Sequence, residues 1–280
     1  MAVLKAFKGL RPPANLAKRV ASRPYDVLNS EEAREEAKGN EYSLLHIIKP
    51  EIDMDPEIDV HAPEVYEKAK ENFLKFQDKD WLVDDEEGYL YIYGQTMWGK
   101  TQYGLVGCAG VDDYLNNVIK KHELTRPDKE EDRMKHVRIN NANVEPVFFS
   151  YPAHAELDGI VKNFVKNNVP EYDFVADDKI GHHFWVIKDK ATIAKIIELF
   201  STIPATYVAD GHHRSASSVI YAQAQKEKYH PSIDYFLAFF IPQSKLKIYD
   251  YNRVVTSLND LSEEEFLEQL KVSFNITEQN

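Results

Sequence analysis

The stretch "YVADGHHRSASS", residues 207–218, decides how the rest of the sequence is interpreted. Apolar residues lead up to Asp210 and a glycine follows, so the pattern predicts a strand, a tight turn and a helix. That helix would begin with His212, His213 and Arg214, although the positive end of the helix dipole disfavours cations. A negatively charged ligand at the helix N-terminus resolves this conflict, because free backbone amides and Arg214 can bind it together.

Two other interpretations of this turn involve no anion. Asp210 can cap the helix and pair with Arg214 at the surface. A zinc site is disfavoured, because adjacent histidines rarely converge on one metal and no cysteine stands nearby. We therefore predict a phosphate-type anion site formed by Gly211, His213, Arg214 and Ser215.

The composition bounds the class of protein. With 280 residues, of which 43% are hydrophobic, the chain can bury a core in one large domain or two smaller ones. Lys and Arg number 34 against 46 Asp and Glu, a net charge of −12, so DNA or RNA is a disfavoured partner. Cys108 is the only cysteine, which argues against a disulfide framework and fits a cytoplasmic location. The sequence shows no secretory signal and no apolar run of about 20 residues, so we expect no membrane segment.

A second motif, "GQTMWGKT" at residues 94–101, has the spacing of a nucleotide-binding P-loop. A P-loop needs a helix directly after its Lys-Thr pair, but residues 101–110 contain three glycines and have strand character. The flanking residues therefore predict a β-hairpin with Met97, Trp98 and Gly99 at its turn, not a phosphate loop.

Strands and helices alternate along the chain. Strands are predicted at residues 2–7, 42–50, 144–152, 172–178, 182–189, 205–210 and 234–242. Helices are predicted at 30–39, with Ser30 as its cap, and at 63–77, 111–124, 127–142, 155–168, 190–201, 213–228 and 262–274. This order indicates an α/β (mixed α+β) fold. We place a soft boundary near residue 143, between an N-terminal α+β region (1–143) and a phosphate-binding α/β region (144–280), and expect the natural chain to continue beyond residue 280.

A second charged stretch, "KKHELTRPDKEEDR" at residues 120–133, joins two predicted helices. Glu123 ends the first helix and Arg126 lies in the loop. By helical spacing, one face of the second helix carries Lys129, Asp132, Arg133 and His136. A solvated helix with internal ion pairs is the alternative, since most charge runs behave in this way.

These segments together resemble an uncharacterised family, catalogued as domain of unknown function 1015 and often labelled SpoOJ/ParA/ParB/RepB-like. The resemblance covers nearly the whole chain and rests on the ordered motifs Pro24-Tyr25-Asp26-Val27, Asp113-Tyr114, His122-Glu123-Leu124-Thr125, Lys129-Glu130 with Asp132-Arg133, and Ala209-Asp210-Gly211-His212-His213-Arg214. The last motif is also similar to one in the wider ParB/sulfiredoxin-like group. That group includes CTP-binding partition proteins, sulfiredoxin and a free-serine kinase that uses ADP or ATP.

The resemblance implies a ParB/sulfiredoxin-like nucleotide-binding core with an elaborated N-terminal region. It also implies that the turn from Gly211 to Arg214 holds nucleotide phosphates. The reaction that we expect is transfer of a phosphoryl group from ATP or ADP, with CTP as an alternative nucleotide, to a small hydroxyl metabolite such as free serine. Mg²⁺ would accompany the nucleotide. The alternatives are a ParB-like nucleotide switch or DNA-partition-type regulatory protein without small-molecule catalysis, and a phosphatase or sensor of a phosphorylated metabolite.

Residue roles follow from residue type and from the resemblance. The group that takes the proton from the hydroxyl would be Glu123, with Asp210 as the alternative base or magnesium ligand and His212 as a further catalytic residue. Cations that neutralise the transferred group would come from Arg126, Lys129 or Arg133. Weaker candidates for substrate contacts are Tyr25, Asp26 and His122.

Overall fold

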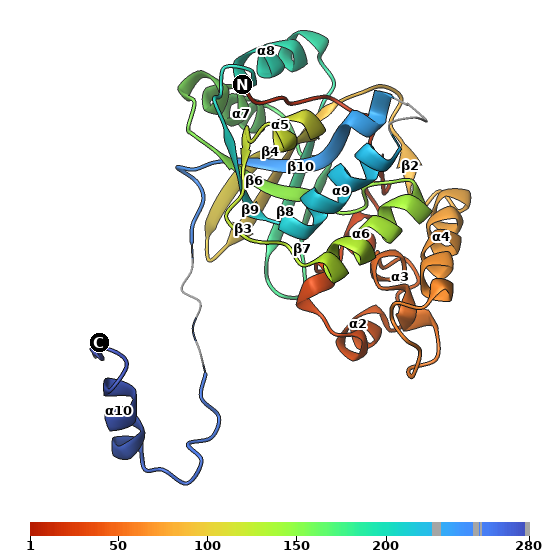
Figure 1. Cartoon of the computed structure of the whole chain (residues 1–280). Coiled ribbons are helices and arrows are strands. Elements are labelled where there is room, and N and C mark those ends of the chain that lie inside the picture. Colours follow the sequence, from red (N-terminus) through yellow and green to blue (C-terminus); the bar gives the residue numbers. More distant parts are fainter. Residues whose placement is uncertain (226–230, 249–251, 253, 278–280) are drawn as a thin grey trace. The chain divides into compact units, whose positions relative to one another are not determined.

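The structure of the chain, a computed structural model, describes residues 1–225, 231–248, 252 and 254–277 (Figure 1). The chain divides into two compact units, Met1–Leu246 and Lys247–Asn280. The boundary expected near residue 143 lies inside the first unit, where strands from both sides of it join one sheet. The predicted helix end at Lys228 lies outside the described residues.

The first unit is built on a mixed sheet of eight strands within the described residues, in the order β5-β9-β6-β10-β4-β3-β8-β7. The strands are β3 (Leu90–Met97), β4 (Lys100–Gly110), β5 (Ile119–Lys120), β6 (Val147–Tyr151), β7 (Tyr172–Val175), β8 (Gly181–Ile187), β9 (Thr206–Asp210) and β10 (Tyr235–Pro242). The β5–β9 and β6–β10 pairs are parallel, and the other neighbours are antiparallel. A separate antiparallel pair joins β1 (Leu10–Arg11) to β2 (Val83–Asp84).

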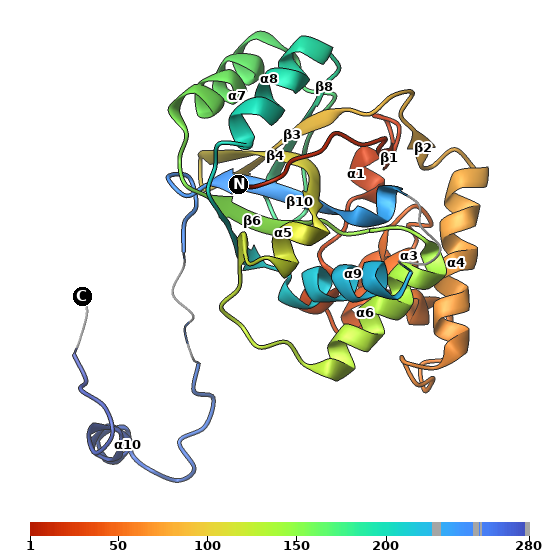
Figure 2. The ribbon, with the colours of Figure 1, turned by 45° about the horizontal axis from the view of Figure 1, so that its top comes forward.

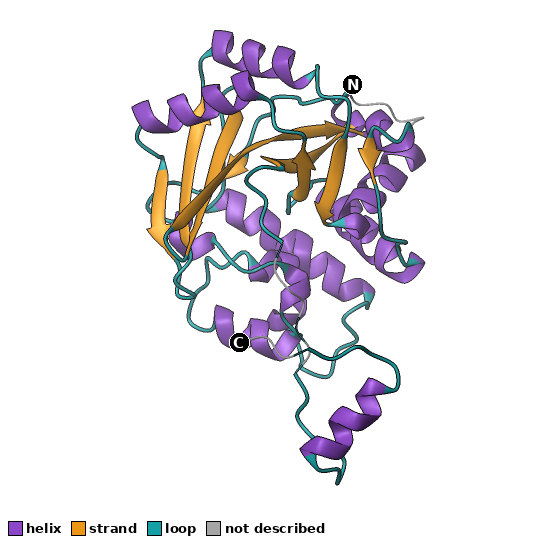
Figure 3. Ribbon diagram, turned by 90° about the vertical axis from the view of Figure 1, so that its left-hand side faces the viewer, coloured by secondary structure: helices purple, strands orange, loops and turns teal. Residues whose placement is uncertain are grey.

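Helices cover both faces of the large sheet (Figures 2 and 3). One face carries α7 (Ala155–Asn167) and α8 (Lys190–Phe200), and the other carries α9 (His212–Ala224) and α6 (Pro127–Asn140). Beyond α6 lie α2 (Ser30–Ala37), α3 (Leu45–Ile48) and α4 (Pro63–Asp78). Short helices α1 (Ala17–Val20) and α5 (Val111–Leu115) complete the first unit's α-helices among the described residues, and α10 (Glu263–Lys271) belongs to the second unit.

The main hydrophobic core lies between the sheet and the helices on its faces. Ile92, Leu105, Phe149 and Phe240 from the central strands are fully buried. Strands covered on both faces need apolar residues on both sides, which explains the long apolar run of β10. The mixed α and β class predicted from the sequence is confirmed.

The hairpin prediction is confirmed as well. Met97 at the end of β3 pairs with Lys100 at the start of β4, so Trp98 and Gly99 form a two-residue turn. Both turn residues have positive φ, 50° and 73°, as a tight hairpin turn that matches the twist of the strands requires. The P-loop pattern therefore lies in a hairpin, where no helix follows the Lys-Thr pair.

Three predicted elements differ from the structure. Residues 42–50, predicted as a strand, contain helix α3, because the short apolar run Leu45–Ile48 fits a buried helix as well as a strand. The helix predicted over 111–124 ends at Leu115, since Asn117 adopts a left-handed conformation (φ 56°) and the chain continues into β5. Residues 2–7 form only isolated bridges to Cys108 and Tyr89.

The N-terminal ends of two helices differ from those that the sequence predicts. The cap of α2 is Asn29, which accepts the N–H of Glu32, and not Ser30. Helix α9 begins at His212, one residue before the predicted start. Among the described residues, none of the helices combines the length and the apolar character needed to cross a bilayer.

Candidate functional site

The turn between β9 and α9 has the strand–turn–helix geometry that the sequence predicts. Gly211 has a φ of 89°, a conformation that glycine adopts without the strain of a side chain. It is the N-cap of α9, and no side chain caps the helix there. The first backbone N–H groups of a helix have no partner within it, so the start of α9 can accept an anion.

The alternative interpretation required Asp210 both to cap α9 and to pair with Arg214. Asp210 does not cap the helix, but it does pair with Arg214. The distance between Asp210 Oδ2 and Arg214 Nη2 is 2.5 Å, and Arg214 Nη1 donates to the carbonyl of Pro146 at 2.8 Å. Arg214 is 12% exposed, while Asp210 is 61% exposed. Arg214 is thus fixed by the protein itself, and an anion at this turn would share it with Asp210.

The two charged stretches meet at the start of α9. The carboxylate of Glu123 lies 3.1 Å from His212 Nδ1, and the backbone N–H of Arg126 donates to His213 Nε2 at 3.2 Å. His122 packs edge-on against His212, with ring centroids 4.4 Å apart. We call Glu123, His122 and His212 the acid–base flank of the turn.

His212 is the buried member of the acid–base flank. It is 5% exposed, against 52% for Glu123, and burial together with the neighbouring His122 lowers the pKa of its imidazole. Its Nε2 has no hydrogen-bond partner among the described residues. Glu123 therefore lies beside an imidazole whose lowered pKa favours its neutral form.

The remaining predicted phosphate ligands lie at different depths. Arg126 is exposed and pairs with Asp128 at 2.6 Å, and Lys129 is exposed at the start of α6. Ser215 is fully buried, and its hydroxyl donates to the carbonyl of Gly211 within α9. The structure therefore leaves the two cations accessible but keeps the Ser215 hydroxyl inside the helix.

Arg133 lies on the other side of the turn, held by a buried network. Its Nε and Nη2 donate to Asp132 Oδ2 at 2.8 and 2.6 Å, and its guanidinium stacks on the ring of Tyr25 at 3.8 Å. Asp132 also accepts the hydroxyl of Tyr66 at 2.7 Å and lies 3.2 Å from His61 Nδ1. Burial alone would raise the pKa of Asp132, but Arg133 and Tyr66 hold it at about 2.

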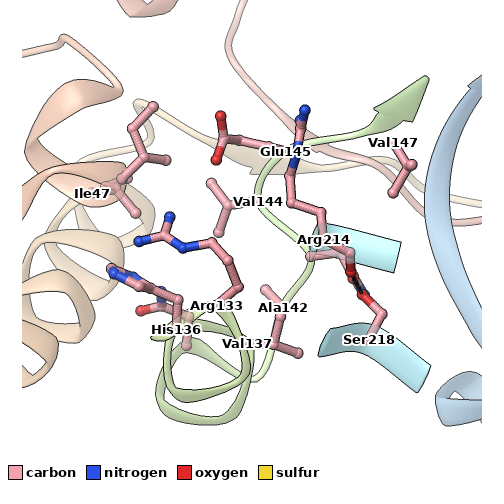
Figure 4. Close-up of a pocket in the computed structure, with 13 residues that line it drawn as sticks. Ile47, Arg133, His136, Val137, Ala142, Val144, Glu145, Val147, Arg214 and Ser218 are labelled. Atoms are coloured by element: carbon pink, nitrogen blue, oxygen red, sulfur yellow. Dashed lines mark hydrogen bonds between the residues drawn. The ribbon is translucent and has the colours of Figure 1, made fainter. Parts of the chain in front are cut away.

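Arg133 and Arg214 line the same cavity, whose volume is about 40 Å³ (Figure 4). Glu145 also lines it and is half-buried, with Oε1 accepting the N–H of Tyr25 at 3.3 Å. Burial raises the pKa of Glu145, although the two arginines act in the opposite direction. We call Arg133, Arg214, Tyr25 and Glu145 the arginine flank.

The structure brings fewer than half of the predicted site residues to one or the other flank. Tyr25 joins the arginine flank and His122 joins the acid–base flank, whereas Asp26 is exposed. Sequence reasoning missed Glu145, because it lies in an irregular segment and only the fold places it near both arginines. Within the described part of the chain, no group of three or more His, Cys, Asp or Glu side chains could hold a metal ion alone.

Comparison with known proteins assigns the chain to a family. A family model described as "Protein of unknown function (DUF1015)" matches residues 4–280. The match spans nearly the whole chain, so the chain belongs to this family. No curated protein and no solved structure matches it.

Proposed function

We propose that this member of the DUF1015 family transfers a phosphoryl group from ATP or ADP to the hydroxyl group of a small metabolite. The observation that carries the proposal is the contact of Glu123 with buried His212 at the uncapped start of α9. A carboxylate beside an anion site is what phosphoryl transfer to a hydroxyl requires. The resemblance to the ParB/sulfiredoxin-like group, in which a Gly-x-x-Arg turn holds nucleotide phosphates, supports the same placement of the donor.

The acid–base flank would act on the acceptor. Glu123 takes the proton of the acceptor hydroxyl as its oxygen forms the new bond to phosphorus and the bond to the nucleotide breaks. His212, whose lowered pKa favours the neutral form, lies 3.1 Å from Glu123 and limits the orientations open to that carboxylate. A positioned general base of this kind contributes a rate factor of roughly 10² to 10⁴.

The donor phosphates would lie against the amides that begin α9, with Arg214 beside them. Arg126 and Lys129, both exposed, can neutralise the transferred group, and Lys129 has no ion-pair partner in the described part of the chain. Mg²⁺ commonly reaches such sites bound to nucleotide phosphates and water, with one or two carboxylates. The exposed carboxylate of Asp210 would be that ligand.

The test is direct product detection. The protein is incubated with Mg²⁺, ATP or ADP, and L-serine among other small hydroxyl compounds, and phosphorylated products are identified by phosphorus NMR and mass spectrometry. We expect Glu123→Gln to lower turnover about 100-fold or more while nucleotide affinity stays the same. Glu198→Gln is the matched control, because Glu198 is exposed on α8, on the opposite face of the sheet.

Each other outcome decides against the proposal or a part of it. Unaltered turnover of Glu123→Gln would remove Glu123 from the reaction. Binding of ATP, ADP or CTP without any product would favour a ParB-like nucleotide switch. Release of phosphate from phosphoserine in the absence of nucleotide would identify a phosphatase.

A further inference from the structure

We infer that the cavity between α3, α6 and α9 binds a small carboxylic acid that carries an amino or hydroxyl group beside its carboxylate. The binding rests on the cavity alone, whereas the role of this acid as phosphoryl acceptor rests on the proposed function. Figure 4 shows Arg133, His136, Glu145 and Arg214 around the cavity.

Arg133 binds the anionic end of the ligand. Asp132 occupies Nε and Nη2 of this guanidinium, which leaves Nη1 without a hydrogen-bond acceptor among the described residues. Stacking on Tyr25 and the bonds to Asp132 fix the plane of the guanidinium, so little conformational entropy is lost when an oxyanion binds. A carboxylate has the charge and the acceptor oxygen that the Nη1 group can bind.

A hydrogen-bond donor beside the carboxylate is required by a second, independent feature. Asn140 lines the cavity, is 8% exposed, and its Oδ1 has no hydrogen-bond partner among the described residues. An unpaired buried oxygen costs roughly 1–3 kcal/mol, so it selects a ligand with an N–H or O–H group. Glu145, whose Oε2 also has no partner in the described chain, adds a second acceptor.

The apolar walls and the small size of the cavity restrict further which ligands can bind. Apolar side chains of Ile47, Val137 and Val144 form part of the lining, which suits carbon atoms better than an inorganic oxyanion. A water molecule needs about 10–15 Å³, so the 40 Å³ of this cavity holds only a few non-hydrogen atoms. The ligand is therefore small, or only its acidic end enters.

The test compares four small probes by ligand-observed NMR titration of the full chain. Glycine and glycolate carry both required groups, acetate lacks the donor, and ethanolamine lacks the carboxylate. We expect acetate and ethanolamine to bind at least about ten-fold more weakly, the factor that a lost hydrogen bond to a charged partner gives. Inorganic phosphate serves as the fifth probe.

The variants separate a ligand role from a structural one. Asn140→Leu should abolish the preference for glycolate over acetate while the melting temperature stays the same or rises, because an unpaired buried polar group is removed. Glu145→Gln should weaken glycine more than glycolate, whereas the exposed control Glu198→Gln changes neither affinity.

Several results would overturn the inference. Equal affinities for all probes, or none for any, would show a water-filled structural cavity. Phosphate that displaces glycine and binds more tightly would show an inorganic anion site. Binding of glycolate without any phosphorylated product would keep the cavity and reject the transfer reaction. Turnover of alcohols without a carboxylate would keep the transfer reaction and reject the acid as its acceptor.

Discussion

The two flanks of the first turn of α9 are built in different ways. The carboxylate of the acid–base flank, Glu123, comes from an irregular loop, is 52% exposed and contacts one buried histidine. The arginine flank uses Arg133 from helix α6, which is 11% exposed and tied to a carboxylate that is 8% exposed. Groups on a loop can adjust to a substrate, whereas buried charges are fixed by their partners and are costly to leave unpaired. The difference assigns chemistry to one flank and ligand positioning to the other.

The largest effect on stability is expected from breaking the network of the arginine flank. Asp132→Asn leaves the buried guanidinium of Arg133 without its counter-charge, which costs roughly 3–5 kcal/mol. Asp128→Asn removes an ion pair of the same kind from exposed Arg126, and we expect a far smaller cost, because solvent screens both charges. Urea unfolding of the two variants measures the difference. Equal costs would contradict the claim that the arginine flank is the rigid one.

The turn that joins the flanks gives the next prediction. Gly211→Ala forces a side chain into a φ of 89°, and its Cβ would lie 3.1 Å from Val147 Cγ1 and 3.2 Å from Arg214 Nε. We expect a loss of about 1–2 kcal/mol. Gly159→Ala is the control, because Gly159 lies within α7 and its Cβ would meet nothing within 4 Å.

The control should move in the opposite direction. Alanine is a better helix former than glycine, so Gly159→Ala is expected to gain about 0.5–1 kcal/mol in thermal unfolding. A neutral Gly211→Ala would mean that the turn can take another conformation. The anion site at the start of α9 would then lose its fixed geometry.

Much of the fold could be predicted from the sequence, because periodicity and turn residues act locally. The hairpin around Trp98 and Gly99 and the helix that begins at Pro127 depend on neighbouring residues alone. The helix at Leu45–Ile48 was missed, since a short apolar run has the same appearance in a buried strand.

The candidate site was predictable in its residues but not in its pairs. The motifs singled out Glu123, His212 and Arg133, yet nothing in their spacing says that Glu123 meets His212 or that Arg133 stacks on Tyr25. Those contacts depend on how α6 packs against α9 and on where the N-terminal segment returns. Glu145 had no sequence signal at all. Its pKa is raised by burial in the folded chain, and no local sequence pattern reveals that burial.

The smallest predicted effect is on the pH dependence of stability, and it compares His136, beside the arginine flank, with His212 in the acid–base flank. Burial and the adjacent charge of Arg133 lower the pKa of His136, beside the arginine flank, to about 3. Unfolded histidine titrates near 6.5, so between these pH values the unfolded chain binds more protons and stability falls as the pH is lowered. His136 should therefore account for a loss of about 0.7 kcal/mol between pH 7 and pH 6, and His136→Gln should remove that loss.

His212 should contribute less to this pH dependence than His136. Burial and His122 lower its pKa, but the carboxylates of Glu123 and Asp210 act in the opposite direction. His46 should have the reverse sign, because Asp53 raises its pKa despite burial, and its stabilisation is lost as the pH rises. Urea unfolding at pH 6 and pH 7 should thus show a flatter dependence for His136→Gln, a smaller change for His212→Gln and a steeper dependence for His46→Gln. If His136→Gln and His212→Gln changed the pH dependence of stability equally, the acid–base flank would disfavour a charged histidine as strongly as the surroundings of His136 do. The physical basis for placing the chemistry in the acid–base flank would then be lost.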